Sequence, residues 1–426
     1  MNGLRHGPAI ALCAGALVAA IASCSGRPLP FDAADGAGGR GGGAGNAGSG
    51  GGVTGIGGGP GLQLLGAPRL LLDSPETGAE LYTTLLWTGE EYLFVWQLFS
   101  GDGVFMQRLD ASGQTIGGNM RLLTSKEAVD LAWGGGRLAA VWKRTNSTAG
   151  PGLFFQTFDR LARPLTAEVK LRSSANIGFD GSFLYGPRIA PIRDRFAIVW
   201  YEGQVLAATV TVDGHAQHGP EAAGGDDLAR APRLSLAVGG DRVLVGWNGR
   251  PSGTPPPGLP TNMMVTRAFS DRLQAIGSRV VLDAACLAGG THQLLATDGG
   301  FLALWTREAA GIAPIAIAQL DADGVPTTTA TMESPVVGRY QDPAPAAWNG
   351  DHLVVLWDRS TINERSLTLA RFSSDGAVQG QPLALPTMEA ARHLYVVAHD
   401  GTVGFIWSEE IGGAYEVYFQ QAKWVP

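Results

Sequence analysis

A short run of aliphatic residues that ends in tryptophan recurs seven times along this chain. A module that recurs at a fixed spacing folds as a series of equivalent units, so this pattern constrains the fold more than any other feature. Neighbouring runs lie 46 to 58 residues apart. A β-sandwich would not repeat one module in this way. The runs end at Trp96, Trp142, Trp200, Trp247, Trp305, Trp357 and Trp407.

The residues around each run complete one structural unit. In the repeat that contains Trp357, a strand-like segment ends at Trp348 and is followed by the turn Asn349-Gly350-Asp351. Gly, Asn and Asp accept the positive φ angles that short hairpins need. After that turn comes the aliphatic run that ends at Trp357. A polar loop then leads to the segment LTLARF, a second turn and a last apolar segment. Four strands in roughly 50 residues, without helical periodicity, predict one antiparallel propeller blade.

The two ends of the repeat region predict how a ring of blades would close. The last repeat stops after its third strand, YEVYFQQAKW. An extra strand, PRLLLD at 68–73, precedes the first repeat and would supply the missing outer strand. A blade shared between the two ends leaves no open sheet edge. We therefore expect an all-β fold over residues 65–426, a seven-bladed β-propeller of four-stranded antiparallel blades closed by an N-terminal strand.

Composition favours a large apolar core and argues against a nucleic-acid partner. Hydrophobic residues make up 45% of the chain and charged residues 16%. The net charge is -7, whereas a protein that binds nucleic acid needs a basic face. Only Cys286 of the three cysteines lies in the repeat region, so the core and not disulfides must stabilise the fold. No cofactor is expected, and a monomer is predicted.

Residues 1–23 have the features of an export signal. One basic residue, Arg5, precedes an apolar stretch that is too short to span a bilayer. The stretch ends in Ile21-Ala22-Ser23-Cys24, which resembles a bacterial lipobox. The resemblance implies cleavage before Cys24, a diacylglyceryl group on its sulfur, and an acyl chain such as palmitate on the new amine. The alternative is an ordinary signal peptide with a chance cysteine.

The segment 24–64 is predicted to be a disordered tether. From Gly36 to Gly61, 16 of 26 residues are glycine, and such a segment cannot bury enough apolar area to offset the entropy of ordering it. Ser25, and not Asp, follows the cysteine, which by the same resemblance favours the outer membrane. The expected location is therefore the cell envelope, with an exported propeller anchored to the membrane through Cys24.

The candidate binding residues lie in the loops that follow the recurring Trp residues. In propellers these loops open on one face near the axis, where a mixture of charges could bind an anionic sugar or a peptide. The same charges could equally serve only to solvate that face. The Trp residues themselves are expected to pack between blades. The candidates are Arg144, Glu202, Arg250, Arg307, Asp358, Arg359 and Glu409.

Three other motifs are better explained by structure than by chemistry. Asp321-Ala-Asp323-Gly324 looks like a calcium loop, but it lacks the other carboxylates of an EF-hand and is predicted to be a turn. His215 and His218 have no cysteine or acidic cluster beside them, so no metal site is predicted. Glu409 and Glu410 are adjacent on an extended segment, so their side chains point opposite ways and do not form a catalytic pair.

The repeat region resembles the propeller domains of bacterial surface lipoproteins, although it carries neither a kelch nor a WD motif. This resemblance implies a fold and a location, not an activity. We predict a non-catalytic binding or scaffolding module for a protein or glycan ligand. One alternative is a glycan-active hydrolase or lyase with its site in the channel, and another is a structural surface module. An acid and a base on the first strands would favour an enzyme, but these strands look apolar apart from His399.

Overall fold

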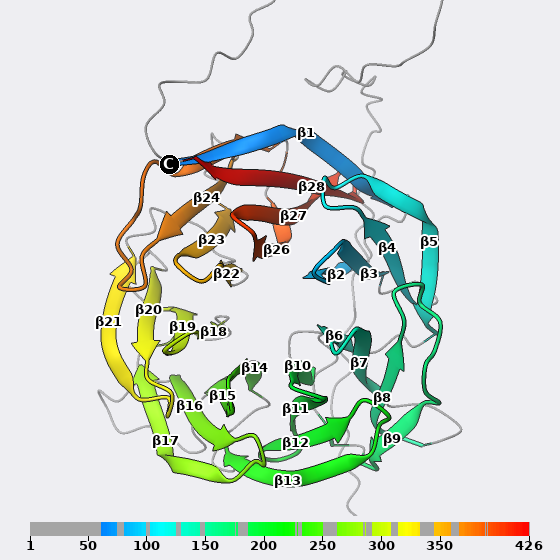
Figure 1. The fold of residues 1–426 in the computed structure, drawn as a ribbon, viewed down its shortest axis with the longest axis vertical. Coiled ribbons are helices and arrows are strands. Elements are labelled where there is room, and N and C mark those ends of the chain that lie inside the picture. Colours follow the sequence, from blue (N-terminus) through cyan, green and yellow to red (C-terminus); the bar gives the residue numbers. More distant parts are fainter. Residues whose placement is uncertain are drawn as a thin grey trace, which may run out of the picture. The chain divides into compact units, whose positions relative to one another are not determined.

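The structure is a computed structural model, and it describes most of residues 61–425 (Figure 1). The predicted signal peptide, Cys24 and the tether up to residue 60 lie outside the described residues. Within 61–425 the segments that are not described are 75–80, 99–102, 125–128, 145–149, 175, 178–185, 226–227, 229–231, 250–261, 284–285, 287–291, 308–313, 333–344, 359–365, 388 and 390.

The described residues form seven four-stranded antiparallel sheets arranged in a ring, which confirms the predicted seven-bladed β-propeller. No helix occurs among them, and hence none that could cross a membrane. The innermost strands of blades 1 to 7 are β2 (Leu81–Trp87), β6 (Val129–Gly134), β10 (Arg188–Ile192), β14 (Arg233–Gly239), β18 (His292–Thr297), β22 (Ala346–Trp348) and β26 (Arg392–His399).

Three further strands follow in each blade, from the axis outwards. The second strands are β3 (Tyr92–Leu98), β7 (Arg137–Arg144), β11 (Arg195–Tyr201), β15 (Arg242–Gly249), β19 (Gly300–Thr306), β23 (Leu353–Asp358) and β27 (Thr402–Ile411). The third strands are β4 (Val104–Leu109), β8 (Gly152–Phe158), β12 (Val205–Thr211), β16 (Met263–Ser270), β20 (Ile315–Leu320), β24 (Ser366–Phe372) and β28 (Ala414–Val425). The outermost strands are β5 (Thr115–Leu123), β9 (Val169–Arg172), β13 (Ala216–Gly224), β17 (Ala275–Asp283), β21 (Pro326–Met332), β25 (Leu383–Pro386) and β1 (Gly61–Ser74).

The core lies between neighbouring blades, because each face of a sheet is covered by the sheet on that side. Phe155 of blade 2 packs against Phe196 of blade 3 with ring centres 6.0 Å apart. The recurring tryptophans belong to these interfaces, and Trp142 and Trp247 are among the largest fully buried side chains. Each such side chain contributes about 1.5–3 kcal/mol of burial free energy.

The N-terminal strand closes the ring as predicted. In Figure 1 the strand β1 lies beside β28, and the two pair from Gly61 with Val425 to Ser74 with Tyr415. The strand begins at Gly61, seven residues before the predicted start at Pro68. At an irregularity in this pairing, Gln420 Nε2 donates to the carbonyl of Leu65 at 3.2 Å.

The turn between the third and fourth strands is built around an acid that accepts backbone hydrogen bonds. Asp321 Oδ1 accepts the N–H of Asp323 at 3.0 Å and that of Val325 at 2.9 Å. Gly324 has a φ of 77°, which an L side chain rarely adopts. The motif therefore forms the predicted turn.

Candidate functional site

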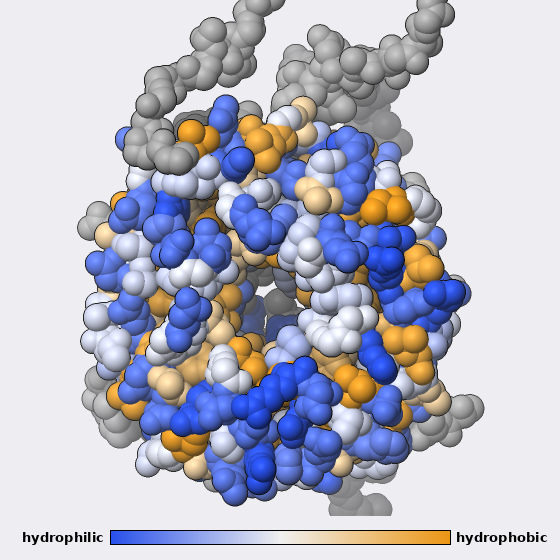
Figure 2. Space-filling model, in the orientation of Figure 1, coloured by the Kyte–Doolittle hydropathy of each residue, from blue (hydrophilic) through white to orange (hydrophobic). Residues whose placement is uncertain are grey.

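The seven innermost strands surround a central opening (Figure 2). Each of these strands begins where the second strand of its blade ends, so that Thr83 pairs with Trp96 and His292 pairs with Trp305. We name this end of the ring the Trp face; it comprises the first residues of the innermost strands and the last residues of the second strands. The predicted binding residues that the structure describes lie at this face, as do the polar residues described next.

Two of the predicted binding residues pair with residues in or beside an outer strand. Arg144 makes two hydrogen bonds of 2.7 Å with Glu168, just before β9, and its guanidinium lies 4.5 Å from the ring centre of Phe154. Glu202 lies 3.0 Å from Nε of Arg172, which is on the outer strand of the preceding blade. These contacts hold the two side chains at the outer part of the Trp face.

Arg307, like Glu202, pairs with a residue on the outer strand of the preceding blade. Its Nε lies 2.7 Å from Asp283, on the outer strand of the preceding blade. The indole N–H of Trp305 also donates to this carboxylate at 2.8 Å. Arg307 therefore joins two blades through an ion pair whose acid is almost fully buried.

The remaining predicted residues are placed as follows. Glu409 is buried and accepts the indole N–H of Trp407 at 2.8 Å. Asp358 ends β23. Arg250 and Arg359 lie outside the described residues. Ligand binding by these loop residues stays a prediction.

Four polar side chains that sequence analysis missed meet near the axis at the Trp face. They are Tyr395 of blade 7, Tyr82 of blade 1, Asp130 of blade 2 and Arg188 of blade 3. Asp130 and Arg188 form an ion pair of 3.8 Å. Arg188 is also close enough to Tyr82 and Tyr395 to interact with them electrostatically. These side chains come from the innermost strands of four consecutive blades, 7, 1, 2 and 3, so they follow the inner rim of the ring and do not belong to one blade interface. We name these four residues the axial cluster.

The carboxyl group of Asp130 is largely shielded from water and accepts hydrogen bonds from the backbone. Its Oδ2 accepts the backbone N–H of Ile189 at 2.8 Å, and 19% of its side chain is exposed. Burial raises the pKa of Asp130 above its ordinary value, while Arg188 and the backbone donors pull it down. The carboxyl group therefore keeps its proton to a higher pH than a surface aspartate does.

Tyr82 lies beside this carboxyl group and is itself buried. Burial is the main reason that the pKa of Tyr82 is raised well above its ordinary value, and Tyr395 and Asp130 raise it further. Arg188 has the opposite effect. The hydroxyl group of Tyr82 is thus protonated in the resting protein and has a second hydroxyl group and a carboxyl group within reach.

The polar ring continues into blades 4 and 5. Arg233 begins β14 and His292 begins β18, and only 7% of His292 is exposed. Burial lowers the pKa of His292 to about 3, and the nearby cations Arg188 and Arg233 also lower it. Its imidazole is therefore neutral at physiological pH.

His399, which the sequence singled out, serves a different purpose. It lies at the other end of β26, where its ring stacks on Trp87 at 3.6 Å and its Nε2 is 2.5 Å from the hydroxyl group of Tyr92. Burial raises the pKa of Tyr92 to about 12. These rings fill the interface between blades 7 and 1, so they stabilise the closure of the propeller.

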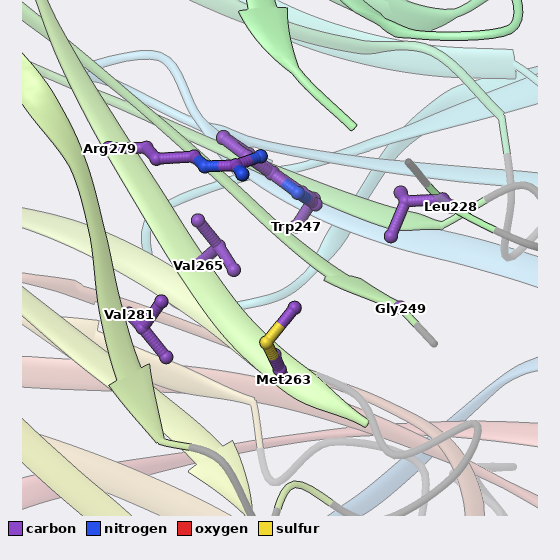
Figure 3. Close-up of a pocket in the computed structure, with 7 residues that line it drawn as sticks. All are labelled: Leu228, Trp247, Gly249, Met263, Val265, Arg279 and Val281. Atoms are coloured by element: carbon purple, nitrogen blue, oxygen red, sulfur yellow. The ribbon is translucent and has the colours of Figure 1, made fainter. Parts of the chain in front are cut away.

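A small, mostly apolar hollow opens between strands of the propeller, and no residue of the axial cluster lines it (Figure 3). Its volume is about 100 Å³, below the roughly 300 Å³ at which ligand pockets begin. It is lined by Leu228, Trp247, Gly249, Met263, Val265, Arg279 and Val281. Among the described residues no group of three or more His, Cys, Asp or Glu could hold a metal ion.

Comparisons with known proteins were made by family, by sequence and by structure. No protein-family description matches the chain, and no curated protein matches its sequence. Solved structures do match. The polysaccharide lyase Uly1 is 9% identical with a TM-score of 0.48, and the match covers 80% of this chain and 89% of that one. The phage phi92 endosialidase is 11% identical with a TM-score of 0.44, covering 82% of this chain and 70% of that one.

A third match is the Bacteroides ovatus protein GH43B of a xyloglucan locus, 13% identical with a TM-score of 0.36, which covers 82% of this chain and 96% of that one. At such identities the likeness shows the fold alone. The matches nevertheless correct one prediction. A polysaccharide lyase and an endosialidase stand among these neighbours, which contradicts the prediction of a non-catalytic binding or scaffolding module; the glycan-active alternative is taken up below as a proposal.

Proposed function

We propose that this protein is an enzyme that cleaves glycosidic bonds, by hydrolysis or elimination, at the Trp-face end of its central channel. The observation that carries the proposal is the axial cluster, in which Tyr82, Asp130, Arg188 and Tyr395 come together from four blades. Perturbed acids and phenols gathered at the mouth of a channel are typical of catalytic sites.

The chemistry of the axial cluster suits the breaking of a glycosidic bond. Such a reaction needs an acid that protonates the departing oxygen, and a carboxyl group with a raised pKa, such as Asp130, can hold that proton. In hydrolysis the attacking group is a water molecule, which releases its proton to solvent as the glycosidic bond breaks, and the hydroxyl groups of Tyr82, which is protonated, and Tyr395 can hydrogen-bond the substrate. Arg188 supplies a positive charge that stabilises negative charge as it develops on the substrate.

A comparison within the ring separates a chemical role for Asp130 from a purely structural one. In blade 5 the equivalent side chain is Gln293, which hydrogen-bonds the N–H and the carbonyl of Ala346 in the next blade at 2.7 and 2.8 Å. Asp130 makes the corresponding contact with Ile189. A neutral amide therefore serves to join two blades, so the ionisable group at Asp130 is not needed for that purpose.

The test uses the full-length protein and a panel of neutral and acidic polysaccharides. The release of new chain ends is measured for the wild type, Asp130→Asn and Tyr395→Phe. We expect cleavage of at least one polysaccharide and a loss of roughly 100-fold or more in each variant. Tyr418→Phe, in the third strand of blade 7, is the matched control and should stay active. No cleavage of any polysaccharide, or full activity of both cluster variants, would overturn the proposal.

The place of action is proposed from the N-terminal sequence. Cys24 ends a lipobox-like segment, so we expect a lipid anchor there, in the cell envelope and most simply in the outer membrane. Cell fractionation of the wild type and Cys24→Ala tests this. The wild type should sediment with membranes and the variant should be released, and membrane retention of the variant would refute the anchor.

A further inference from the structure

Blade 4 departs from the repeat at one position. The residue before the recurring Trp is glycine in this blade, Gly246, and it lies opposite Ser235 on the innermost strand. A Cβ atom at Gly246 would lie 2.6 Å from Ser235 Oγ and 2.9 Å from Leu294 Cδ1. The missing side chain lets Ser235 Oγ, Leu294 and Met264 occupy the space that a bulky aliphatic residue fills in the other blades. The equivalent residues are Val95, Val141, Val199, Leu304, Leu356 and Ile406.

The imidazole of His292 comes from blade 5 to this glycine. The backbone of Gly246 is near enough to affect the pKa of His292, but not in the geometry of a hydrogen bond. Neither ring nitrogen of His292 has a hydrogen-bond partner among the described residues, and Ser235 Oγ has none either. Both side chains are at least nine-tenths buried. Buried polar atoms are nearly always satisfied, so two such groups that both lie near Gly246 indicate a place for a ligand.

The charge around these groups indicates which ligand. Arg188 and Arg233 both act electrostatically on His292; Arg188 donates from Nε to the carbonyl of Leu234 at 3.0 Å, and its Nη1 lies 3.8 Å from Asp130. Positive charge is therefore concentrated beside unsatisfied hydrogen-bonding groups. A carboxylate matches this arrangement, because arginine forks bind it in charge-assisted pairs and a neutral imidazole N–H and a serine hydroxyl can donate to it.

We propose that Arg188, Arg233, His292 and Ser235 form a subsite for the carboxylate of an acidic sugar, so that the substrate is a uronate-containing glycan. This inference rests on the proposed function and names its substrate class. The subsite adjoins the axial cluster through Arg188, which belongs to both. The bond to be cleaved would therefore lie beside the acidic sugar that the subsite holds.

The experiment measures binding and cleavage separately. Uronate oligosaccharides and their uncharged methyl esters, which differ only at the carboxyl group, are titrated against the full-length protein by calorimetry. We expect the acids to bind at least about tenfold more tightly than the esters. Arg233→Gln should abolish this preference, whereas Arg242→Gln, which alters a partly buried arginine at the opposite end of blade 4, should keep it. Equal affinity for acid and ester would overturn the inference, and so would an unchanged preference in Arg233→Gln.

A second variant protects the test against misfolding. Gly246→Ala places a methyl group in the space beside Ser235, and it should weaken acid binding while the variant keeps the sheet signal of the wild type in circular dichroism. A folded Gly246→Ala protein that binds uronates as tightly as the wild type would contradict the subsite. Cleavage of neutral glycans alone would overturn the subsite and leave the proposed function intact. Uronate binding that depends on Arg233, without cleavage of any polysaccharide, would support the subsite and overturn the proposed function.

Discussion

At the scale of the residue, the propeller places different chemistry at equivalent positions. His292 pairs with the recurring Trp of blade 5, and the equivalent residues of blades 1, 2 and 4 are Thr83, Val129 and Leu234. A hydroxyl group or an aliphatic chain at this position needs no partner beyond its own blade. A buried imidazole does, and its environment disfavours the charged form.

This environment predicts a pH dependence of stability. The pKa of His292 is about 3 in the folded protein and about 6.5 in the unfolded chain, so the unfolded state takes up a proton first as the pH falls. Stability from the neutral ring is complete above pH 6.5 or so and is lost between there and about pH 3. Between pH 7.5 and pH 5 the wild type should lose about 2 kcal/mol more than His292→Gln. Urea unfolding at both pH values measures the difference, and parallel losses in the two proteins would contradict it.

The axial cluster could have been found in the sequence only with a finer alignment of the repeats. The apolar ends of the innermost strands, such as LLW and LAW, were recognisable because they adjoin the hairpin turns. Asp130, Arg188 and Tyr395 lie nearer the other ends of these strands, where the connecting loops vary in length. Counting residues back from each hairpin would place Asp130 and Arg188 at the same level. That Tyr395 of blade 7 comes close to Tyr82 of blade 1 depends on ring closure, which no local pattern specifies.

At the scale of the element, β1 contributes more than an outer edge. Its first half places Leu62 and Leu64 against the core between blades 6 and 7, and its second half places Leu71 and Leu72 against the core between blades 7 and 1. The sequence identified only the second half, because Gly61 and Gly66 make the first half resemble the glycine-rich segment before it. The alternation of Leu62 and Leu64 was nevertheless a strand signal.

Removal of β1 should therefore destabilise the ring. A chain that lacks residues 1–74 loses four leucine contacts and leaves the edge of β28 unpaired, which costs at least about 4 kcal/mol and exposes an aggregation-prone edge. A chain that lacks residues 1–56 keeps β1 and serves as the control. Thermal melting and light scattering compare the two. Similar melting temperatures and monomeric states would show that β1 does not close the ring.

At the scale of the whole molecule, ring closure creates the site. Tyr82 and Tyr395 are separated by more than 300 residues in sequence, yet they act on each other because blade 7 meets blade 1. The repeat pattern predicted this closure, the blade number and the sheet topology. It did not predict the axial cluster, because a repeat reports what the blades share, and this cluster consists of residues in which the blades differ.

The most direct test of the central claim is a crystal structure of full-length Asp130→Asn soaked with a uronate oligosaccharide that the wild type binds. The account predicts a sugar in the channel at the Trp face, with hydroxyl groups within hydrogen-bonding distance of Tyr82 and Tyr395 and its carboxylate at Arg188 and Arg233. An oligosaccharide found only outside the channel or at the opposite face would contradict it.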